Sequence, residues 1–357
     1  MPQILNAEIE WLDDGSPFSR QFNDIYFSSQ GGPAESEHVF LNSNNLADRW
    51  QQHSSPAPFF MVELGFGTGL NFLLCWRLLE KLAIDGLHLH YLAFEKHPLT
   101  IEDLRRCHTL WPELQNYSAS LLESVVDHTP GLHRLCLGHH ITLDLYLGDA
   151  LAGMEELFAS HNARVDCWFM DGFAPARNPE LWSDSLAEIM WQQSNIAATV
   201  STYSVAGQVR RSLQKAGFEL ERLPGYGNKR EMLRGRKHQN SQKQLLTQHP
   251  KIYRRPGWYK TTTITPACKQ AVVVGAGLAG CATAYSLSRR GWQITLIESA
   301  SGIAAGASGN RQGALQPRLA AEHSTRALFY IHGLLFAHRQ FSQLQQVRDI
   351  GWHPDGI

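Results

Sequence analysis

The sequence lacks an excess of charge of either sign, a paired-cysteine motif and a long uninterrupted apolar run. Lysine and arginine together number 32 against 33 aspartates and glutamates, so net charge neither favours nor excludes a nucleic-acid partner. The six cysteines form no C-x-x-C pair, which argues against a metal site and for reduced core residues in a cytoplasmic protein. The longest apolar stretch, residues 58–76, contains Glu63 and three glycines, so it predicts strand, turn and helix instead of a membrane span. No basic segment followed by an apolar one opens the chain, so we expect no secretory signal.

The chain has 357 residues, 43% hydrophobic and 18% charged, which predicts two to three folded domains of about 150 residues. Residues 1–58 have a mixed pattern, with a hairpin signal at 13–15, and are assigned as a lid or flanking element. From Phe59 onward, apolar runs alternate with helical stretches, which indicates a mainly parallel sheet covered by helices. The predicted strands are 59–64, 89–94, 141–147, 165–170 and 197–202, with a terminal hairpin at 218–223 and 230–233. The predicted helices are 70–82, 100–107, 183–193 and 207–216. Seven strands in this order resemble the methyltransferase variant of the doubly wound, Rossmann-like α/β fold, over residues 59–236.

A glycine-rich turn follows the first of these strands. Gly65, Gly67 and Gly69 have the spacing G-x-G-x-G, and glycine is needed where a ligand approaches the backbone closely. Glu63 precedes the turn and would repel a pyrophosphate, so a cationic ligand such as S-adenosylmethionine suits the site better. With Asn71 opening the helix, the segment resembles the first motif of methyltransferases. The alternative is a purely structural glycine turn.

Two further acids follow predicted strands. Glu95 lies 26 residues after Gly69, where a carboxylate can accept both ribose hydroxyls of a nucleoside. Asp149 follows the next strand and is placed to accept from an adenine amino group. Each has a simpler interpretation, as a solvated acid at a helix start or as the N-cap of the following helix.

The strand at 165–170 ends in Asp171, followed by Gly172, Phe173, Ala174 and Pro175. Amino-methylating enzymes commonly place an Asp or Asn followed by aromatic and proline residues at this point, where strand ends converge on the methyl group of the ligand. A substrate amine must keep its lone pair free, so an acceptor has to hold its N–H groups or take its proton, and Asp171 can do both. Phe173 could stack on a base or face the sulfonium, or belong to the core; Asp171 could also be only a helix cap.

Positive charge concentrates between residues 229 and 260. Ten lysines and arginines occur there against one acid, Glu231. The segment 237–269 is assigned as a basic linker, and two interpretations stay open for the whole basic stretch: a solvated connector, or a surface that contacts phosphates. The ten basic residues are Lys229, Arg230, Arg234, Arg236, Lys237, Lys243, Lys251, Arg254, Arg255 and Lys260.

A second glycine loop begins a new βαβ unit. Gly275, Gly277 and Gly280 give the complete G-x-G-x-x-G after an apolar strand, and Glu298 ends the second strand 23 residues after Gly275. Strand, helix and terminal acid together predict dinucleotide binding with an unphosphorylated ribose. Residues 306–317 resemble the second flavin-contacting segment of D-amino-acid-oxidase-like enzymes, which favours FAD over NAD.

Taken together, the motifs resemble one family, the bifunctional enzymes that modify the wobble uridine of tRNA. The resemblance implies methylation of a 5-aminomethyl-2-thiouridine with S-adenosylmethionine, and an FAD-dependent removal of a carboxymethyl group in the preceding step. It also implies that Gly65, Gly67 and Gly69 contact the methionine part of the cofactor, Glu95 the ribose and Asp149 the adenine, with Asp171 as the catalytic acid. Near the substrate we add Tyr203, Lys229 and Arg230. The segments that carry the resemblance are 14–17, 22–27, 63–71, 171–175, 178–182 and 225–232.

The flavin unit is expected to be partial, because only 87 residues follow Gln270 and a βαβ unit needs later strands to complete its sheet. For residues 270–357 we therefore expect poor retention of FAD and exposed sheet edges, as in a truncated product or a fragment. Two rival functions stay open: a flavin-dependent amine oxidase, and a non-catalytic tRNA-binding module.

Overall fold

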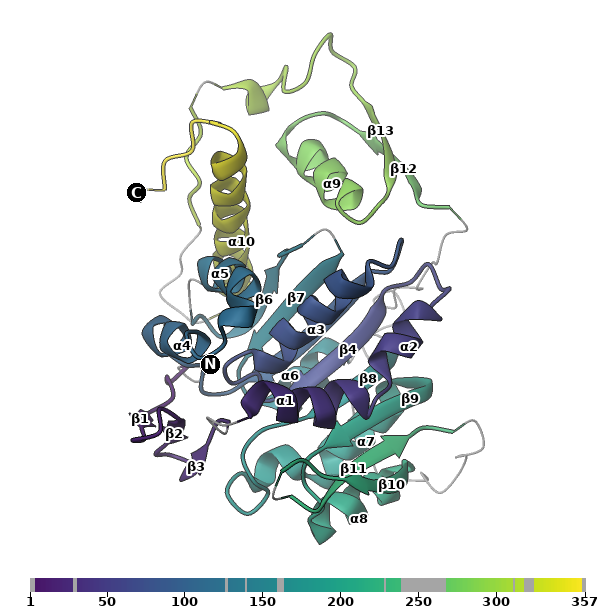
Figure 1. Ribbon diagram of the computed structural model, residues 1–357. Helices are drawn as coiled ribbons and strands as arrows, with labels where there is room; N and C mark the ends of the chain where they lie inside the picture. Colours follow the sequence, from purple (N-terminus) through teal and green to yellow (C-terminus); the bar gives the residue numbers. More distant parts are fainter. Residues whose placement is uncertain are drawn as a thin grey trace.

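The structure is a computed structural model, which describes residues 4–27, 31–125, 128–138, 140–158, 164–227, 229–238, 268–310, 312–317 and 324–354. Its centre is an eight-stranded sheet in the order β10-β11-β9-β8-β4-β5-β7-β6, with helices on both faces (Figure 1). The strands are β4 (Phe59–Leu64), β5 (Leu89–Glu95), β6 (Gly131–Leu135), β7 (Ile141–Leu147), β8 (Val165–Met170), β9 (Ser194–Thr202), β10 (Glu219–Pro224) and β11 (Glu231–Arg236).

The pairing of this sheet confirms the doubly wound α/β prediction. The five strands β7, β5, β4, β8 and β9 run parallel, and the hairpin β10–β11 joins β9 in antiparallel register. The predicted count of seven strands is one short, because β6 pairs antiparallel with β7 at the far edge. Its sequence, Gly-Leu-His-Arg-Leu, has too few apolar residues to give a strand signal.

Two separate cores fill the space between the sheet and its helices. Along β4, Phe59 and Met61 enter one core while Val62 and Leu64 enter the other, as the alternation of side chains along a strand requires. The first core includes α3 and the second includes α7 and α8. The helices of this part are α2 (Leu46–Gln51), α3 (Leu70–Leu82), α4 (Ile101–His108), α5 (Gln115–Ser124), α6 (Ala150–Phe158), α7 (Asp184–Gln193) and α8 (Gly207–Ala216).

The amino-terminal segment forms a small antiparallel sheet of its own. Strands β1 (Ile9–Trp11), β2 (Pro17–Ser19) and β3 (Asp24–Ile25) are joined through the predicted turn, where Asp14 accepts from the backbone N–H of Ser16. Helix α1 (Gly32–Ser36) and a π-helical stretch (Glu37–Asn42) then lead into α2.

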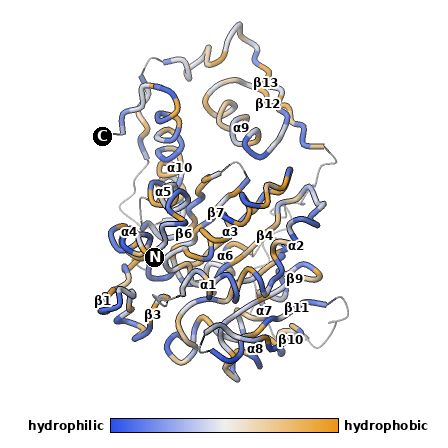
Figure 2. The backbone as a smooth tube through the Cα atoms, viewed as in Figure 1, coloured by the Kyte–Doolittle hydropathy of each residue, from blue (hydrophilic) through white to orange (hydrophobic). Residues whose placement is uncertain are grey.

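The βαβ prediction for the last part of the chain is also confirmed. Strand β12 (Gln270–Val274), helix α9 (Leu278–Ser288) and β13 (Gln293–Ile297) form a two-stranded parallel sheet with its crossover helix, and α10 (Thr325–Val347) follows. Apolar residues of β12 remain uncovered, since Val274 is 82% exposed, and Figure 2 shows orange, hydrophobic stretches beside the β12 label. Helix α10 packs against the edge strand β6, where His332 hydrogen-bonds the carbonyl of Pro130 at 2.9 Å. Most of the predicted basic linker, residues 239–267, lies outside the described residues.

Candidate active site

The first glycine loop connects β4 to α3 at the carboxyl edge of the sheet. Gly65, Gly67 and Gly69 have φ angles of +87°, +52° and +76°, a region in which side chains with a Cβ are strained. At Gly65 there is a second reason for glycine, since a Cβ would lie 2.9 Å from the carbonyl oxygen of Asp171. The loop after β4 and the loop after β8 therefore lie directly against each other.

A cavity of about 460 Å³ opens between these loops and the ends of β5 and β7. Parallel strands gather their carboxyl ends at one edge, and ligands of such sheets bind there. The residues of the cavity wall that matter for the argument are Gly65, Gly67, Asn71, Glu95, Lys96, Asp149, Asp171, Phe173 and Glu180, with Phe22 and Tyr26 from the amino-terminal segment.

Asn71 joins the two acids that precede and face the loop. Its Nδ2 donates to Glu63 Oε1 at 2.7 Å and to Asp171 Oδ2 at 2.8 Å. The Asn71 side-chain oxygen is buried and has no hydrogen-bond partner among the described residues. A buried acceptor without a donor is costly, so this oxygen is suited to receive an N–H group from a ligand in the cavity.

Glu63 lies in β4, two residues before Gly65, and is not among the residues that line the cavity. Its side chain is 1% exposed and accepts from Asn71 and, at 2.9 Å, from the hydroxyl of Tyr91. Burial, reinforced by the negative charge of Asp171, raises its pKa well above the usual range. Glu63 is thus linked to the cavity wall through its hydrogen bond with Asn71.

Asp171 lines the cavity at the end of β8. Burial raises the pKa of its carboxyl to about 6, against the opposing effect of hydrogen bonds from the Gly172 backbone and Asn71. A carboxyl with a pKa this close to neutrality can hold or accept a proton from an amine bound in the cavity.

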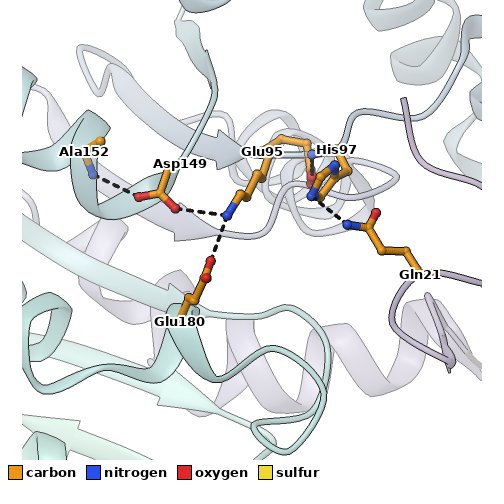
Figure 3. Close-up of polar contacts among 7 residues, drawn as sticks. Gln21, Glu95, His97, Asp149, Ala152 and Glu180 are labelled. Atoms are coloured by element: carbon orange, nitrogen blue, oxygen red, sulfur yellow. Dashed lines mark hydrogen bonds and ion pairs between the residues drawn. The ribbon is translucent and has the colours of Figure 1, made fainter. Parts of the chain in front are cut away.

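Glu95 and Asp149 line the cavity farther along the edge (Figure 3). Glu95 accepts from the backbone N–H groups of Gly67 and His97, each at 2.8 Å, so it also fixes the glycine loop. Asp149 accepts from the N–H of Ala152 in the first turn of α6. Asp149 thus caps the start of α6, as the simpler interpretation predicted, and both carboxylates also line the cavity.

The sequence did not reveal an ion-pair bridge across this end of the cavity. Lys96 donates to Glu180 at 2.7 Å and lies 3.4 Å from Asp149 (Figure 3). The bridge joins the loop after β5 to the segment after β8. Lys96 follows Glu95 directly, but nothing in the local pattern indicates a partner 84 positions away.

The four residues predicted on the substrate side lie in two groups. Phe173 is on the cavity wall, whereas the hydroxyl of Tyr203 donates to the carbonyl of Gly172 at 2.7 Å. The ammonium of Lys229 lies 4.3 Å from the centre of the Tyr203 ring and pairs with Glu35 at 2.7 Å. Arg230 is exposed and makes no ion pair within the described ranges.

Within the basic stretch, two residues besides Lys229 also make contacts within the fold. Arg234 pairs with Glu221 and donates to the carbonyl of Ser43. Lys237 donates to the carbonyls of Trp191 and Ser194, and burial lowers its pKa.

The second glycine loop has the geometry of a dinucleotide site. Gly275 has a φ of +96°, and a Cβ at Gly280 would lie 1.8 Å from the Gly275 carbonyl oxygen, so the helix can approach the loop only with glycine there. Glu298 accepts from the N–H of Ala276 at 2.7 Å. Ser308, in the segment that resembles a flavin contact, accepts from the N–H of Leu278 at the start of α9.

Two protein-family models match separate parts of the chain. The family described as S-adenosyl-L-methionine-dependent methyltransferase matches residues 112–238, and the family described as FAD dependent oxidoreductase matches residues 270–357. Curated relatives extend the likeness to the entire chain. The tRNA 5-methylaminomethyl-2-thiouridine biosynthesis bifunctional protein MnmC of Stutzerimonas stutzeri is 42% identical over 353 residues, 99% of this chain and 51% of the relative. That of Pseudomonas aeruginosa is also 42% identical, over 100% of this chain and 52% of the relative.

The chain resembles MnmC along its whole length. The resemblance predicted from the motifs is confirmed, and the chain spans about half the length of the curated relatives it matches. Among solved structures, that of MNMC2 from Aquifex aeolicus aligns with a TM-score of 0.50 at 24% identity, covering 66% of this chain and 71% of the other. This likeness supports the fold. None of the helices in the described part of the chain is long and apolar enough to cross a membrane.

Proposed function

We propose that the chain is a methyltransferase that moves a methyl group from S-adenosylmethionine to the aminomethyl nitrogen of a wobble 5-aminomethyl-2-thiouridine in tRNA. The observation that carries the proposal is the half-buried Asp171 carboxylate on the wall of the cavity, which accepts a hydrogen bond from Asn71 beside the glycine loop. The similarity to MnmC proteins supports the same reaction class.

The residues of the cavity fit S-adenosylmethionine. The unpaired oxygen of Asn71 can accept from the ammonium of the methionine part, and the left-handed glycines leave room for it. Glu95 and Asp149 present carboxylates toward the positions proposed for ribose and adenine. Glu63 contributes through Asn71. The cofactor, when bound, supplies an electrophilic methyl group.

The chain's own residues then prepare the acceptor. Asp171 holds an N–H of the substrate amine, or takes its proton, so that the nitrogen lone pair is free to attack. Asn71 fixes the orientation of this carboxylate by a 2.8 Å hydrogen bond. The aromatic rings of Phe22, Tyr26 and Phe173 exclude water from the same side of the cavity.

Recognition of tRNA is proposed for Lys229 and Arg230, with Tyr203 and Phe173 nearer the base. Lys229 and Arg230 belong to the loop between β10 and β11, and Lys229 lies over the ring of Tyr203. A phosphate could replace Glu35 as the partner of Lys229.

The domain boundaries stay proposals. They are a lid or flanking segment over 1–58, a methyltransferase domain over 59–236, a linker over 237–269 and a partial FAD-dependent oxidoreductase domain over 270–357. The cytoplasmic location expected from cysteine usage also stays a prediction.

A second activity is proposed only for the longer proteins that this chain resembles. Gly275, Gly277, Gly280 and Glu298 would hold the FAD dinucleotide, and FAD would supply the oxidising power for removing a carboxymethyl group. The match of residues 270–357 to FAD dependent oxidoreductases favours this candidate.

One purification and one assay test the proposal. The purified chain should bind S-adenosylmethionine and methylate tRNA that carries 5-aminomethyl-2-thiouridine. A yellow protein that oxidises amines without methyl transfer would favour the flavin oxidase. Binding of tRNA with neither cofactor would favour a binding module.

A further inference from the structure

The segment from Gln21 to Tyr26 lies across the loop that follows Asp171. The Asp24 carboxylate accepts from the backbone N–H of Ala174 at 3.1 Å, a contact between positions 150 residues apart. The ring of Phe22 stacks on Phe173 with centroids 4.6 Å apart, and Tyr26 meets Phe173 edge-on at 4.9 Å. The sequence motif at 22–27 carried the family resemblance but had no role assigned to it.

The loop after Asp171 depends on such contacts because little else in it is buried. Gly172 has a φ of +128°, and Phe173 is only partly buried, with its ring between Phe22 and Tyr26. On the other side, its backbone is held by the Trp182 indole N–H, which donates to the Phe173 carbonyl at 3.0 Å, and by the Tyr203 hydroxyl, which donates to the Gly172 carbonyl at 2.7 Å. The N–H groups of Arg177 and Asn178 close a turn on the Ala174 carbonyl. Asn71 fixes the Asp171 carboxylate from the side of the glycine loop, and the amino-terminal segment holds the backbone of the loop 172–174 from the other side.

We propose that Asp24 is a positioning residue for methyl transfer, which holds the loop 171–175 closed through the Ala174 N–H while Phe22 and Tyr26 clamp Phe173. The effect of Asp24 on methyl transfer rests on the proposed function, whereas its role in holding the loop closed does not. Asp24 is not among the residues of the cavity wall, where cofactor and substrate are proposed to bind. It acts through the loop that presents Asp171, and a small displacement of a catalytic group is enough to slow a reaction strongly.

The direct readout is amide hydrogen exchange in the cofactor-free protein. Asp24→Ala removes the acceptor for Ala174, so exchange in a peptide spanning 171–177 should accelerate by about tenfold or more. Asp24→Asn keeps one oxygen that can accept from Ala174 and should fall between Asp24→Ala and the wild type. The matched control is Asp13→Ala, at an exposed acid in the turn of the same small sheet, which should leave this peptide unchanged.

The catalytic readout uses the same variants in methyl transfer. Asp24→Ala should lower kcat on the order of ten- to a hundredfold. The acid limb of the pH–rate profile of this variant should also move to lower pH. An opened loop hydrates Asp171 and removes the burial that raises the pKa of its carboxyl. A purely structural role would change the melting temperature without moving this limb.

The outcomes separate the two proposals. If the wild type transfers no methyl group, the proposed function fails while hydrogen exchange still decides the role of Asp24. If the wild type is active, the positioning role is overturned when Asp24→Ala matches the wild type in hydrogen exchange of the 171–177 peptide, in kcat or in the acid limb of the pH–rate profile. It is also overturned when Asp13→Ala has the same effects as Asp24→Ala. Should Asp24→Ala fail to fold, Asp24→Asn carries the same measurements.

Discussion

The side-chain amide of Asn71 donates to the carboxylate of Asp171 across 2.8 Å, from the first turn of the helix that follows the glycine loop. The two residues follow different strands of the sheet, β4 and β8, and one is proposed to bind the cofactor while the other acts on the substrate. A donor at this distance stabilises the ionised carboxylate and partly offsets the effect of burial on its pKa. The contact thus links cofactor binding to the protonation state of the proposed catalytic acid.

The first prediction concerns turnover. Asp171→Ala should lower kcat for methyl transfer by about a hundredfold or more, the usual size of a lost general base. Affinity for S-adenosylmethionine, measured by calorimetry, should stay near the wild-type value because Asn71, Glu95 and the glycine loop remain. Turnover within a few-fold of wild type would show that another group prepares the amine.

The second prediction concerns pH. The pKa of Asp171 is raised to about 6, so below this pH the carboxyl is protonated and cannot take a proton from the amine. The value of kcat/KM, which reports the free enzyme, should therefore fall about tenfold per pH unit below pH 6. Asn71→Ala removes a hydrogen bond that lowers this pKa, so its acid limb should move to higher pH. A profile that stays flat down to about pH 5, or an Asn71→Ala limb that moves the other way, would contradict the assignment.

Most of the central sheet could be predicted because its strands are buried on both faces. Residues 59–64, 141–147 and 165–170 are mostly apolar runs with one acidic residue each, and each prediction matches the observed strand at both ends. Strand β6 was not predicted from the sequence. It is an edge strand covered by α10 from a distant part of the chain, so it needs few apolar residues of its own. Its pairing depends on tertiary contacts that no local pattern records.

The site residues that could be predicted are those at the ends of strands or directly after them. Gly65 and Asp171 follow parallel strands and Glu95 ends one, so their convergence follows from the topology. The contributions of Phe22, Asp24, Lys96 and Glu180 depend on contacts between positions far apart in the chain. The interior position of Glu63 was also missed, because a charged residue beside a glycine loop suggests a ligand and burial is invisible in the sequence.

The third prediction separates an indirect from a direct role of Glu63. Burial favours the protonated form of this side chain, and glutamine mimics that form with one acceptor and one donor group. Glu63→Gln should therefore keep cofactor affinity within a few-fold. Glu63→Ala removes the acceptor of one Asn71 N–H and of the Tyr91 hydroxyl, so it should weaken binding and lower stability by about 1–3 kcal/mol. Calorimetry and thermal unfolding measure both effects. Loss of binding in Glu63→Gln equal to that in Glu63→Ala would indicate that the charge itself contacts the ligand.

The fourth prediction concerns the tRNA surface. Replacing Lys229 and Arg230 with alanine should weaken tRNA binding and reduce the slope of log affinity against log salt by roughly one unit per lost phosphate contact. The matched control is Lys237→Ala, because Lys237 is held by the carbonyls of Trp191 and Ser194. It should change thermal stability more than the salt slope. An unchanged slope in the double variant would remove this loop from the RNA interface.

The last prediction concerns the independence of the two glycine loops. Gly275 and Gly277 belong to the turn between β12 and α9, and the cavity beside Asp171 includes neither of them. Replacing both with valine should therefore leave methylation of 5-aminomethyl-2-thiouridine tRNA within a few-fold of wild type, provided that the protein stays soluble.

The FAD-dependent step should be absent even in the wild-type chain. Strands β12 and β13 form a sheet of two strands with exposed apolar residues such as Val274, and a two-stranded sheet is marginally stable by itself. The 357-residue chain, assayed alone with added FAD, should therefore leave carboxymethylaminomethyl tRNA unprocessed. Release of glyoxylate in that assay would contradict this, and would mean that a second copy of the chain completes the flavin site.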